Sequence, residues 1–336
     1  MSAEQTTSRP ISTAFASELR QWGPDAPVVR EDSLAAAESY CRRLATSHYE
    51  NFPLISWLLP KQLHQHFYNV YAYCRWADDL GDEVTGTQRS LELLSWWRSE
   101  LIDCYRGSAR HPVFVALNKS IEDLAIPQQP FDDLISAFEQ DQRVHDYETF
   151  TQLRDYCRRS ANPVGRMVLH ICGHATEENV GWSDSICTGL QLANFWQDVA
   201  RDFDIGRVYL PREDRDRFRY SRSDLDSRLS NEAFMKLMRF EVERARAFLT
   251  AGLPLIEQFP GRLQVDIDLF ARGGLKILDR IERIGYGVWD RRPVVTKGDV
   301  ATLFLGSLCR AFGRCFGVHP SSSTGKIDAA EGPKVG

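Results

Sequence analysis

Apolar side chains recur at three- and four-residue steps along most of this chain, and this spacing limits its fold more than any other feature. It is the period of a helix with one buried face, whereas the two-residue alternation of a half-buried strand is hard to find. We therefore predict an all-α fold. The period and the helix-start residues place helices at 33–47, 61–83, 88–106, 112–124, 131–143, 149–172 with a break at Pro163, 183–204, 231–250, 263–286 and 298–316.

The periodic region runs from residue 33 to residue 316 without a long linker, which favours one large domain with a substantial core. Residues 1–32 mix Ser, Thr, Pro and charge without sustained periodicity, and residues 317–336 are rich in Ser, Gly, Lys and Pro. We expect both ends to be disordered extensions. The run 212–222 mixes charges of both signs and is expected to form a solvated loop or a flap.

Composition argues against several classes of function. Lys and Arg total 41 against 46 Asp and Glu, for a net charge of −5, and no basic stripe is present, so nucleic acid is not an expected partner. The eight cysteines lie inside apolar helical patterns, which is typical of reduced core residues in a cytoplasmic protein. We find no secretory signal and no apolar run near the roughly 18 residues that span a bilayer. Peripheral contact with the inner membrane face stays open.

Two of the expected helices carry rows of acidic side chains. In the helix 61–83, steps of three and four residues give one face to Arg75, Asp78 and Asp82. Asp79 and Glu83 lie about 100° further round the helix and form a second row. In the helix 183–204, steps of three, four and four residues give one face to Gln191, Asn194, Asp198 and Asp202.

Buried rows of carboxylate and amide groups are costly without partners. Mg²⁺ removes this cost, because it takes oxygen ligands and is usually shared between one or two carboxylates and a substrate phosphate. One Asp-x-x-x-Asp set alone is more often a solvated helix face. Two sets, each at the end of an apolar stretch with Arg or amide companions in phase, favour a site for several Mg²⁺ ions and a diphosphate. The metal would promote departure of pyrophosphate by neutralising its developing charge.

Four segments carry a specific pattern. They read His-Tyr-Glu-Asn-Phe-Pro at 48–53, Tyr-Ala-Tyr-Cys-Arg-Trp-Ala-Asp-Asp-Leu-Gly-Asp-Glu at 71–83, Gln-Leu-Ala-Asn-Phe-Trp-Gln-Asp-Val-Ala-Arg-Asp at 191–202 and Gly-Arg-Val-Tyr-Leu-Pro at 206–211. This pattern resembles the squalene/phytoene synthase family over roughly residues 33–316. The resemblance implies a single-domain isoprenoid-synthase helical bundle with a central active-site cavity and an isoprenoid diphosphate as substrate.

The resemblance also implies roles by position. The Mg²⁺ ligands and catalytic residues would be Asp78, Asp82, Asp198 and Asp202. Substrate or diphosphate contacts would come from His48, Phe52, Arg75, Gln191, Asn194, Arg207 and Arg292. The candidates for orienting a water molecule are Asp79, Glu83 and Gln197.

Within the family, residues 48–53, the turn 162–166 and the Asn-Phe-Trp-Gln-Asp form of the second acidic motif are most similar to the hydroxysqualene synthases of bacterial hopanoid biosynthesis. That resemblance implies ionisation of presqualene diphosphate and capture of the cation by water, without NADPH. It further implies functional links to a presqualene diphosphate synthase and to a squalene-forming reductase.

Two departures from the condensing members of the family bear on this interpretation. Arg159 replaces the second tyrosine of their usual Tyr-Cys-x-Tyr pattern, and Gln197 stands where an arginine often occurs. Both favour a member specialised in one half-reaction. Two alternatives stay open: head-to-head condensation of two farnesyl diphosphates to presqualene diphosphate or squalene, and a non-catalytic assembly or scaffold relative.

Overall fold

The computed structural model describes residues 13–26, 33–47, 60–294, 296, 298, 299, 302–304, 306 and 307. Within these residues every named element is a helix, and the single β-type contact is an isolated bridge between Asp146 and Val208. The all-α prediction is confirmed. In this part of the chain, no helix is both long enough and apolar enough to cross a membrane.

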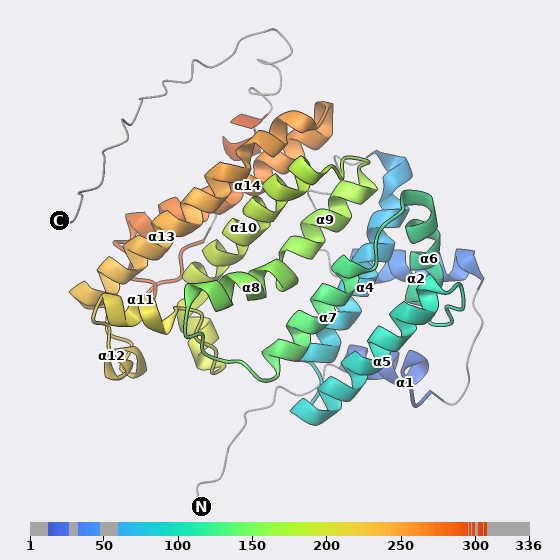
Figure 1. Cartoon of the computed structure of the whole chain (residues 1–336), viewed down its shortest axis with the longest axis horizontal. Helices are drawn as coiled ribbons and strands as arrows, with labels where there is room; N and C mark the ends of the chain where they lie inside the picture. The colour runs from blue at the N-terminus through green and yellow to red at the C-terminus, as the bar shows by residue number, and fades with distance from the viewer. Residues whose placement is uncertain are drawn as a thin grey trace, which may run out of the picture.

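The helices follow one another through short connections (Figure 1). In chain order they are α1 (Thr13–Trp22), α2 (Leu34–Ser47), α4 (His64–Asp82), α5 (Thr87–Tyr105), α6 (Pro112–Leu124), α7 (Gln129–Asp141), α8 (Phe150–Ser160), α9 (Asn162–Ile171), α10 (Glu177–Asp204), α11 (Arg212–Arg217), α12 (Arg222–Asp226), α13 (Glu232–Gly252) and α14 (Gly261–Arg283). Two 3₁₀ helices, η1 (Lys61–Leu63) and η2 (Leu253–Gln258), precede α4 and follow α13.

Most predicted helices agree with these bounds to within a few residues. The predicted helix 149–172 is two helices, and Pro163 lies in the first turn of the second, where a missing N–H costs no hydrogen bond. The helix predicted to start at residue 183 starts at Glu177, because the Thr176 side chain caps it by accepting from the Asn179 backbone N–H. The last predicted helix, 298–316, lies largely outside the described residues.

The core consists of two clusters of buried side chains. The N-terminal core lies among α1, α2, α4, α5 and α6, on the blue to teal side of Figure 1. The C-terminal core lies among α8, α10, α13 and α14, on the lime to orange side. Helices α7 and α9 give residues to both cores and so join the two halves. The two acidic helices, α4 and α10, therefore belong to different halves of the molecule.

The prediction of a disordered extension over residues 1–32 is wrong for α1. Phe15 is only 5% exposed and packs edge-on against Trp76 of α4, with ring centroids 5.2 Å apart. The Tyr40 hydroxyl donates to Glu18 at 2.8 Å. Phe15, Leu19 and Trp22 do follow helical steps, but this pattern is too short to stand out in a polar segment. The rest of residues 1–32, apart from 23–26, and all of 317–336 lie outside the described residues.

The run 212–222 is also not the solvated loop or flap that its charges suggested. It contains α11, in which Asp214 and Arg215 are each 3% exposed. Arg215 Nη2 lies 2.6 Å from Asp146 Oδ1, and Arg244 Nη1 lies 2.8 Å from Asp214 Oδ2. Paired charges can be buried where single ones cannot, so the mixed signs here reflect ion pairs with other elements.

Candidate active site

The last turns of α4 present the first acidic row. Tyr73, Trp76, Ala77 and Leu80 are buried in the N-terminal core, so that the opposite face carries the acidic side chains. Arg75 serves both rows: its Nη1 lies 3.5 Å from Asp78 Oδ2, its Nε donates to Asp79 Oδ2 at 3.0 Å, and its Nη2 lies 3.3 Å from Glu83 Oε1. These contacts follow from the helical spacing of three, four and eight residues.

Burial raises the pKa of two acids of α4, Asp78 and Asp79. It raises the pKa of Asp78 to about 6, with repulsion from Asp82 as the next cause and Arg75 acting in the opposite direction. It raises the pKa of Asp79 to about 7, again against the attraction of Arg75. One guanidinium group therefore does not fully compensate the carboxylates around it.

The second acidic row lies at the end of α10, which is not a regular helix throughout. Leu192, Phe195, Trp196 and Val199 are buried in the C-terminal core, as the apolar pattern predicts. At Asp198 the backbone leaves the helical region, with φ −106° and ψ 15°, and the helix is kinked. This sparsely populated region is one in which active-site residues are often found.

Asp198 and Asp202 differ in their partners. Arg292 binds Asp198 through two hydrogen bonds, Nε to Oδ1 at 2.5 Å and Nη2 to Oδ2 at 3.0 Å. The Oδ2 atom of Asp202 is buried and has no hydrogen-bond partner among the residues that the structure describes. Burial, followed by repulsion from Asp198, raises the pKa of Asp202 to about 7. The second row therefore has one carboxylate that binds an arginine directly and one that the nearby arginines compensate only in part.

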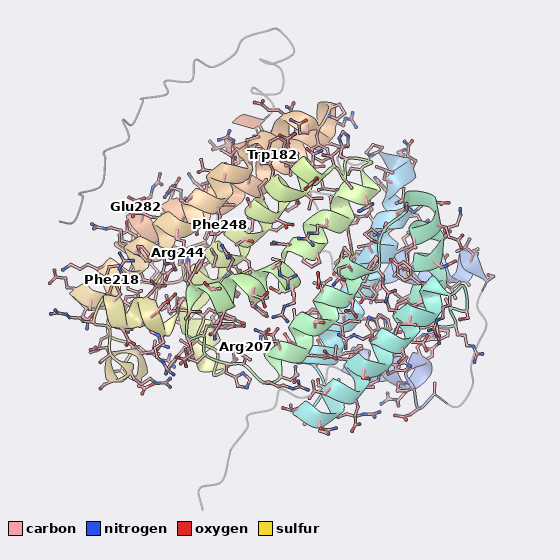
Figure 2. The ribbon with its side chains drawn as sticks, in the orientation of Figure 1. Trp182, Arg207, Phe218, Arg244, Phe248 and Glu282 are labelled. Atoms are coloured by element: carbon pink, nitrogen blue, oxygen red, sulfur yellow. The ribbon has the colours of Figure 1, made fainter. Side chains whose placement is uncertain are left out.

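Arg207 connects the two rows. Gly206, at φ +79°, lets the chain turn back at the end of α10, and the Arg207 backbone N–H donates to the Asp202 carbonyl at 2.8 Å. The side chain reaches across to α4, where its Nη2 lies 3.2 Å from Asp82 Oδ1. Figure 2 shows Arg207 in the lower middle of the molecule, next to the end of α7. This ion pair joins residues 125 positions apart and places the two acidic helix ends at one site.

Sequence reasoning missed a further acid at this site, Asp141, the last residue of α7. It is 7% exposed and accepts a hydrogen bond from the Tyr156 hydroxyl at 2.9 Å. Burial raises its pKa to about 6, opposed by Arg207 and by Tyr156. Tyr156 in turn stacks on Phe195 and Tyr209, so an aromatic stack adjoins the acidic site.

Three helix ends carry acids where the helix dipole disfavours negative charge. Helices α4, α7 and α10 each end in aspartates, at Asp82, Asp141 and Asp204. The C-terminal end of a helix carries partial negative charge, so acids there are unfavourable without a counter-charge. This conflict was visible in the sequence for all three helices, and it is the signal that could have identified Asp141.

The remaining predicted site residues differ in their burial and in their partners, and two of them are not described. Gln191 is half-buried and Asn194 is exposed on α10, before the kink. The buried Gln197 amide donates to the Pro293 carbonyl at 2.6 Å. All three predicted water-orienting groups thus have partners, since Asp79 and Glu83 bind Arg75. His48 and Phe52 lie outside the described residues.

The acids fit a metal ion that is shared with a ligand better than one held by protein alone. Among the described residues, no group of three or more His, Cys, Asp or Glu side chains is placed to hold a metal ion. Mg²⁺ typically takes one or two carboxylates and completes its shell with water and substrate phosphate. Burial raises the pKa values of Asp78 and Asp202 in spite of the arginines near them, and the buried Oδ2 of Asp202 accepts no hydrogen bond from the described residues, so a cation would stabilise both carboxylates.

Comparison with known proteins decides the family. The model of the squalene/phytoene synthase family matches residues 45–299, a range that contains both acidic rows, Arg207 and Arg292. The chain belongs to this family. The resemblance inferred from the acidic motifs is thereby confirmed, and the squalene/phytoene synthase family consists of isoprenoid synthases that bind isoprenoid diphosphates.

Relatives within the squalene/phytoene synthase family carry more than one name. The solved structure of squalene synthase HpnC from Alicyclobacillus acidocaldarius is 43% identical, with a TM-score of 0.73, and the match covers 75% of this chain and 95% of that one. A phytoene synthase of Arthrospira platensis is 33% identical over 80% of this chain and 90% of its own length. A hydroxysqualene synthase of Rhodopseudomonas palustris is 34% identical over 62% of this chain and 71% of its own length.

Proposed function

We propose that this member of the family ionises presqualene diphosphate with the help of Mg²⁺ and lets water capture the cation, giving hydroxysqualene and pyrophosphate. The observation that carries the ionisation is the Arg207–Asp82 ion pair, which brings the aspartates of α4 and α10 to one site. The similarity to the hydroxysqualene synthase of Rhodopseudomonas palustris and to HpnC supports the choice of substrate and product. A presqualene diphosphate synthase would supply the substrate, and a squalene-forming reductase would consume the product.

In this proposal each residue has a defined task. Four aspartates would hold the metal: Asp78, Asp82, Asp198 and Asp202. When bound, Mg²⁺ would neutralise the negative charge that develops on the departing pyrophosphate. Arg207 and Arg292 would donate to diphosphate oxygens, a task that suits the planar fork of a guanidinium group.

The aromatic stack beside the acids has a second task. Phe195 and Tyr209 lie face to face with ring centroids 3.7 Å apart, and both belong to the C-terminal core. The outer face of such a stack would attract a carbocation through its π electrons. This side of the site therefore suits a reaction in which a cation must survive until one chosen water molecule reaches it.

A second candidate is condensation of two prenyl diphosphates, which would make the protein a prenyltransferase rather than a carbon–oxygen lyase. The phytoene synthase of Arthrospira platensis favours it, because this relative matches more of the chain than the hydroxysqualene synthase does. Arg159 argues the other way. It replaces a tyrosine of the condensing members, and its Nη2 binds Gln140 Oε1 at 2.5 Å and Asp155 Oδ2 at 2.7 Å.

Product analysis separates the candidates. Purified protein with Mg²⁺ is incubated in ¹⁸O-water with presqualene diphosphate or with farnesyl diphosphate, and the products are identified by mass spectrometry. We expect ¹⁸O-labelled hydroxysqualene from presqualene diphosphate, no product from farnesyl diphosphate and no effect of NADPH. Presqualene diphosphate or squalene formed from farnesyl diphosphate would support the condensing alternative. No turnover, together with no Mg²⁺-dependent stabilisation by pyrophosphate, would support the scaffold alternative.

A further inference from the structure

Two arginines of the C-terminal half already bind aspartates of the proposed metal site. Arg207 pairs with Asp82 of α4, and Arg292 binds Asp198 of α10 through two hydrogen bonds. Each acidic row thus has one carboxylate that is neutralised by an arginine from a distant part of the chain. A metal ion at Asp198 would compete with Arg292 for both carboxylate oxygens, and a metal ion at Oδ1 of Asp82 would compete with Arg207.

Arg292 is held at Asp198 by a built structure. Arg292 lies three residues after Trp289, whose indole N–H donates to the Tyr220 hydroxyl at 3.2 Å. The Trp289 ring lies edge-on to the Phe203 ring, with centroids 5.5 Å apart. Arg292 precedes Pro293, whose carbonyl accepts from the buried Gln197 amide at 2.6 Å. Gln197 and Asp198 are neighbours in sequence, so α10 binds the returning segment at two successive residues. The ion pair is therefore a fixed part of the fold and not a chance surface contact.

Arg207 is fixed in a comparable way. Its backbone is tied to the Asp202 carbonyl, and its guanidinium group lies within the electrostatic reach of Asp141 and Tyr209 as well as Asp82. Removing this guanidinium from Asp82 without a new acceptor would leave a partly buried cation short of counter-charge, which is strongly unfavourable. A diphosphate group supplies such an acceptor, because its oxygens accept charge-assisted hydrogen bonds from arginine.

We propose that Arg207 and Arg292 are internal counter-cations that release Asp82 and Asp198 to a divalent metal ion only when a diphosphate group accepts their hydrogen bonds. The inference rests on the proposed function. It makes metal and diphosphate binding one coupled event, in which each ligand raises the affinity for the other by the same factor. Without diphosphate, the two arginines keep the affinity for Mg²⁺ low.

The test measures binding and not turnover. Isothermal titration calorimetry gives the affinity of the full-length protein for Mg²⁺ alone, for inorganic pyrophosphate alone, and for each in the presence of the other. We expect Arg207→Gln and Arg292→Gln each to raise the affinity for Mg²⁺ alone by about tenfold, and to reduce the coupling with pyrophosphate by a similar factor.

Arg201→Gln is the matched control. Arg201 carries the same charge, and its Nε lies 3.7 Å from the same Asp198, but its side chain is 67% exposed and the contact is loose. Exposed pairs of this kind contribute little. We expect the affinity of this variant for Mg²⁺ alone to change by less than about twofold. An equal effect of Arg201→Gln and Arg292→Gln would overturn the proposal, because only the general charge would then matter.

Two further outcomes keep this inference separate from the proposed function. If the wild-type protein binds Mg²⁺ and pyrophosphate together, but both arginine variants bind Mg²⁺ alone no better than wild type, the counter-cation role fails and the metal site stands. If the wild-type protein does not bind the two ligands together at all, the proposed function fails. Arg207→Lys keeps the charge and should keep the affinity for Mg²⁺ alone low, so it tests the idea even if Arg207→Gln does not fold.

Discussion

The two halves of the molecule build their acidic rows in different ways. In the N-terminal half, α4 is a regular helix, and its acids are served by Arg75 from the same helix. In the C-terminal half, α10 is kinked at Asp198, and the arginine that binds this residue comes from 94 positions further along the chain. One row is thus assembled by helical spacing alone, whereas the other depends on the completed fold.

The core of the N-terminal half offers the largest expected effect on stability. Trp97 is fully buried and stacks on Trp76 with ring centroids 5.3 Å apart. We expect Trp97→Ala to lower the free energy of unfolding by about 3–5 kcal/mol. Because α7 and α9 belong to both cores, unfolding in urea followed by circular dichroism should still show one transition.

Two separate transitions for Trp97→Ala would show that the halves fold independently and would weaken the comparison above. Leu229→Ala is the control for this experiment. Leu229 is 44% exposed, so we expect its replacement to change stability by less than about 0.5 kcal/mol.

The second prediction is that turnover depends equally on the two acidic rows. Asp78→Asn and Asp198→Asn should each lower turnover of presqualene diphosphate by at least about 10²-fold, because each removes a charge that would bind the metal. Steady-state kinetics with Mg²⁺ in excess checks this, and the far-ultraviolet circular dichroism of both variants should match wild type. Near-normal turnover of either variant would mean that one half supplies the metal site alone.

The long-range assembly of the second row can be tested through Gln197. Gln197→Leu leaves the Pro293 carbonyl without its donor, and we expect a loss of about 1–3 kcal/mol in thermal or urea unfolding. Glu83→Gln is the comparison in the first row. Glu83 shares Arg75 with Asp78 and Asp79, so we expect this change to cost less than about 1 kcal/mol. If Glu83→Gln lowered the free energy of unfolding more than Gln197→Leu does, the proposed contrast between local and long-range assembly would be reversed.

The last prediction concerns pH, and the two halves should respond in opposite directions. In the N-terminal half, burial lowers the pKa of His111 to about 3, so the unfolded chain binds the proton more tightly and stability falls as pH drops from about 6.5 towards 3. In the C-terminal half, burial raises the pKa of Asp266 to about 8, so the folded chain binds the proton more tightly. Its contribution is lost as pH rises from about 4 towards 8.

Single variants separate these two responses. Asp266→Asn should gain about 1 kcal/mol in stability relative to wild type for each pH unit between pH 5 and pH 8, as neither Asp266 oxygen has a hydrogen-bond partner among the described residues. His111→Asn should gain a similar amount relative to wild type for each pH unit from pH 6 down to pH 4, as the His111 Nε2 atom also has no partner in the described part of the chain. Urea unfolding at several pH values measures both. If the free energy of unfolding of a variant changed with pH in parallel with that of wild type, the replaced residue would not be the source of the pH response of its half.

The first acidic row could be predicted from the sequence because it depends only on helical spacing. The shared face of Arg75, Asp78 and Asp82 needs no tertiary information, and a regular helix realises it. The second row could be predicted only in part. The spacing indicated the side of α10, but the kink at Asp198 has no adjacent proline or glycine to announce it.

Contacts between distant segments could not be predicted from local sequence patterns. The sequence resemblance suggested that Arg207 and Arg292 bind diphosphate, but not that they bind Asp82 and Asp198. Asp141 was missed because it ends an ordinary amphipathic helix, and only its place at the helix C-terminus was unusual. The roles of His48 and Phe52 stay predictions.

The convergence of three acidic helix ends also affects what leaves the site. Under the proposed function, the same negative poles would repel free pyrophosphate as soon as the metal dissociates. Release of pyrophosphate would then follow from loss of the metal, and a phosphate compound without a divalent ion would bind more weakly than one that carries it.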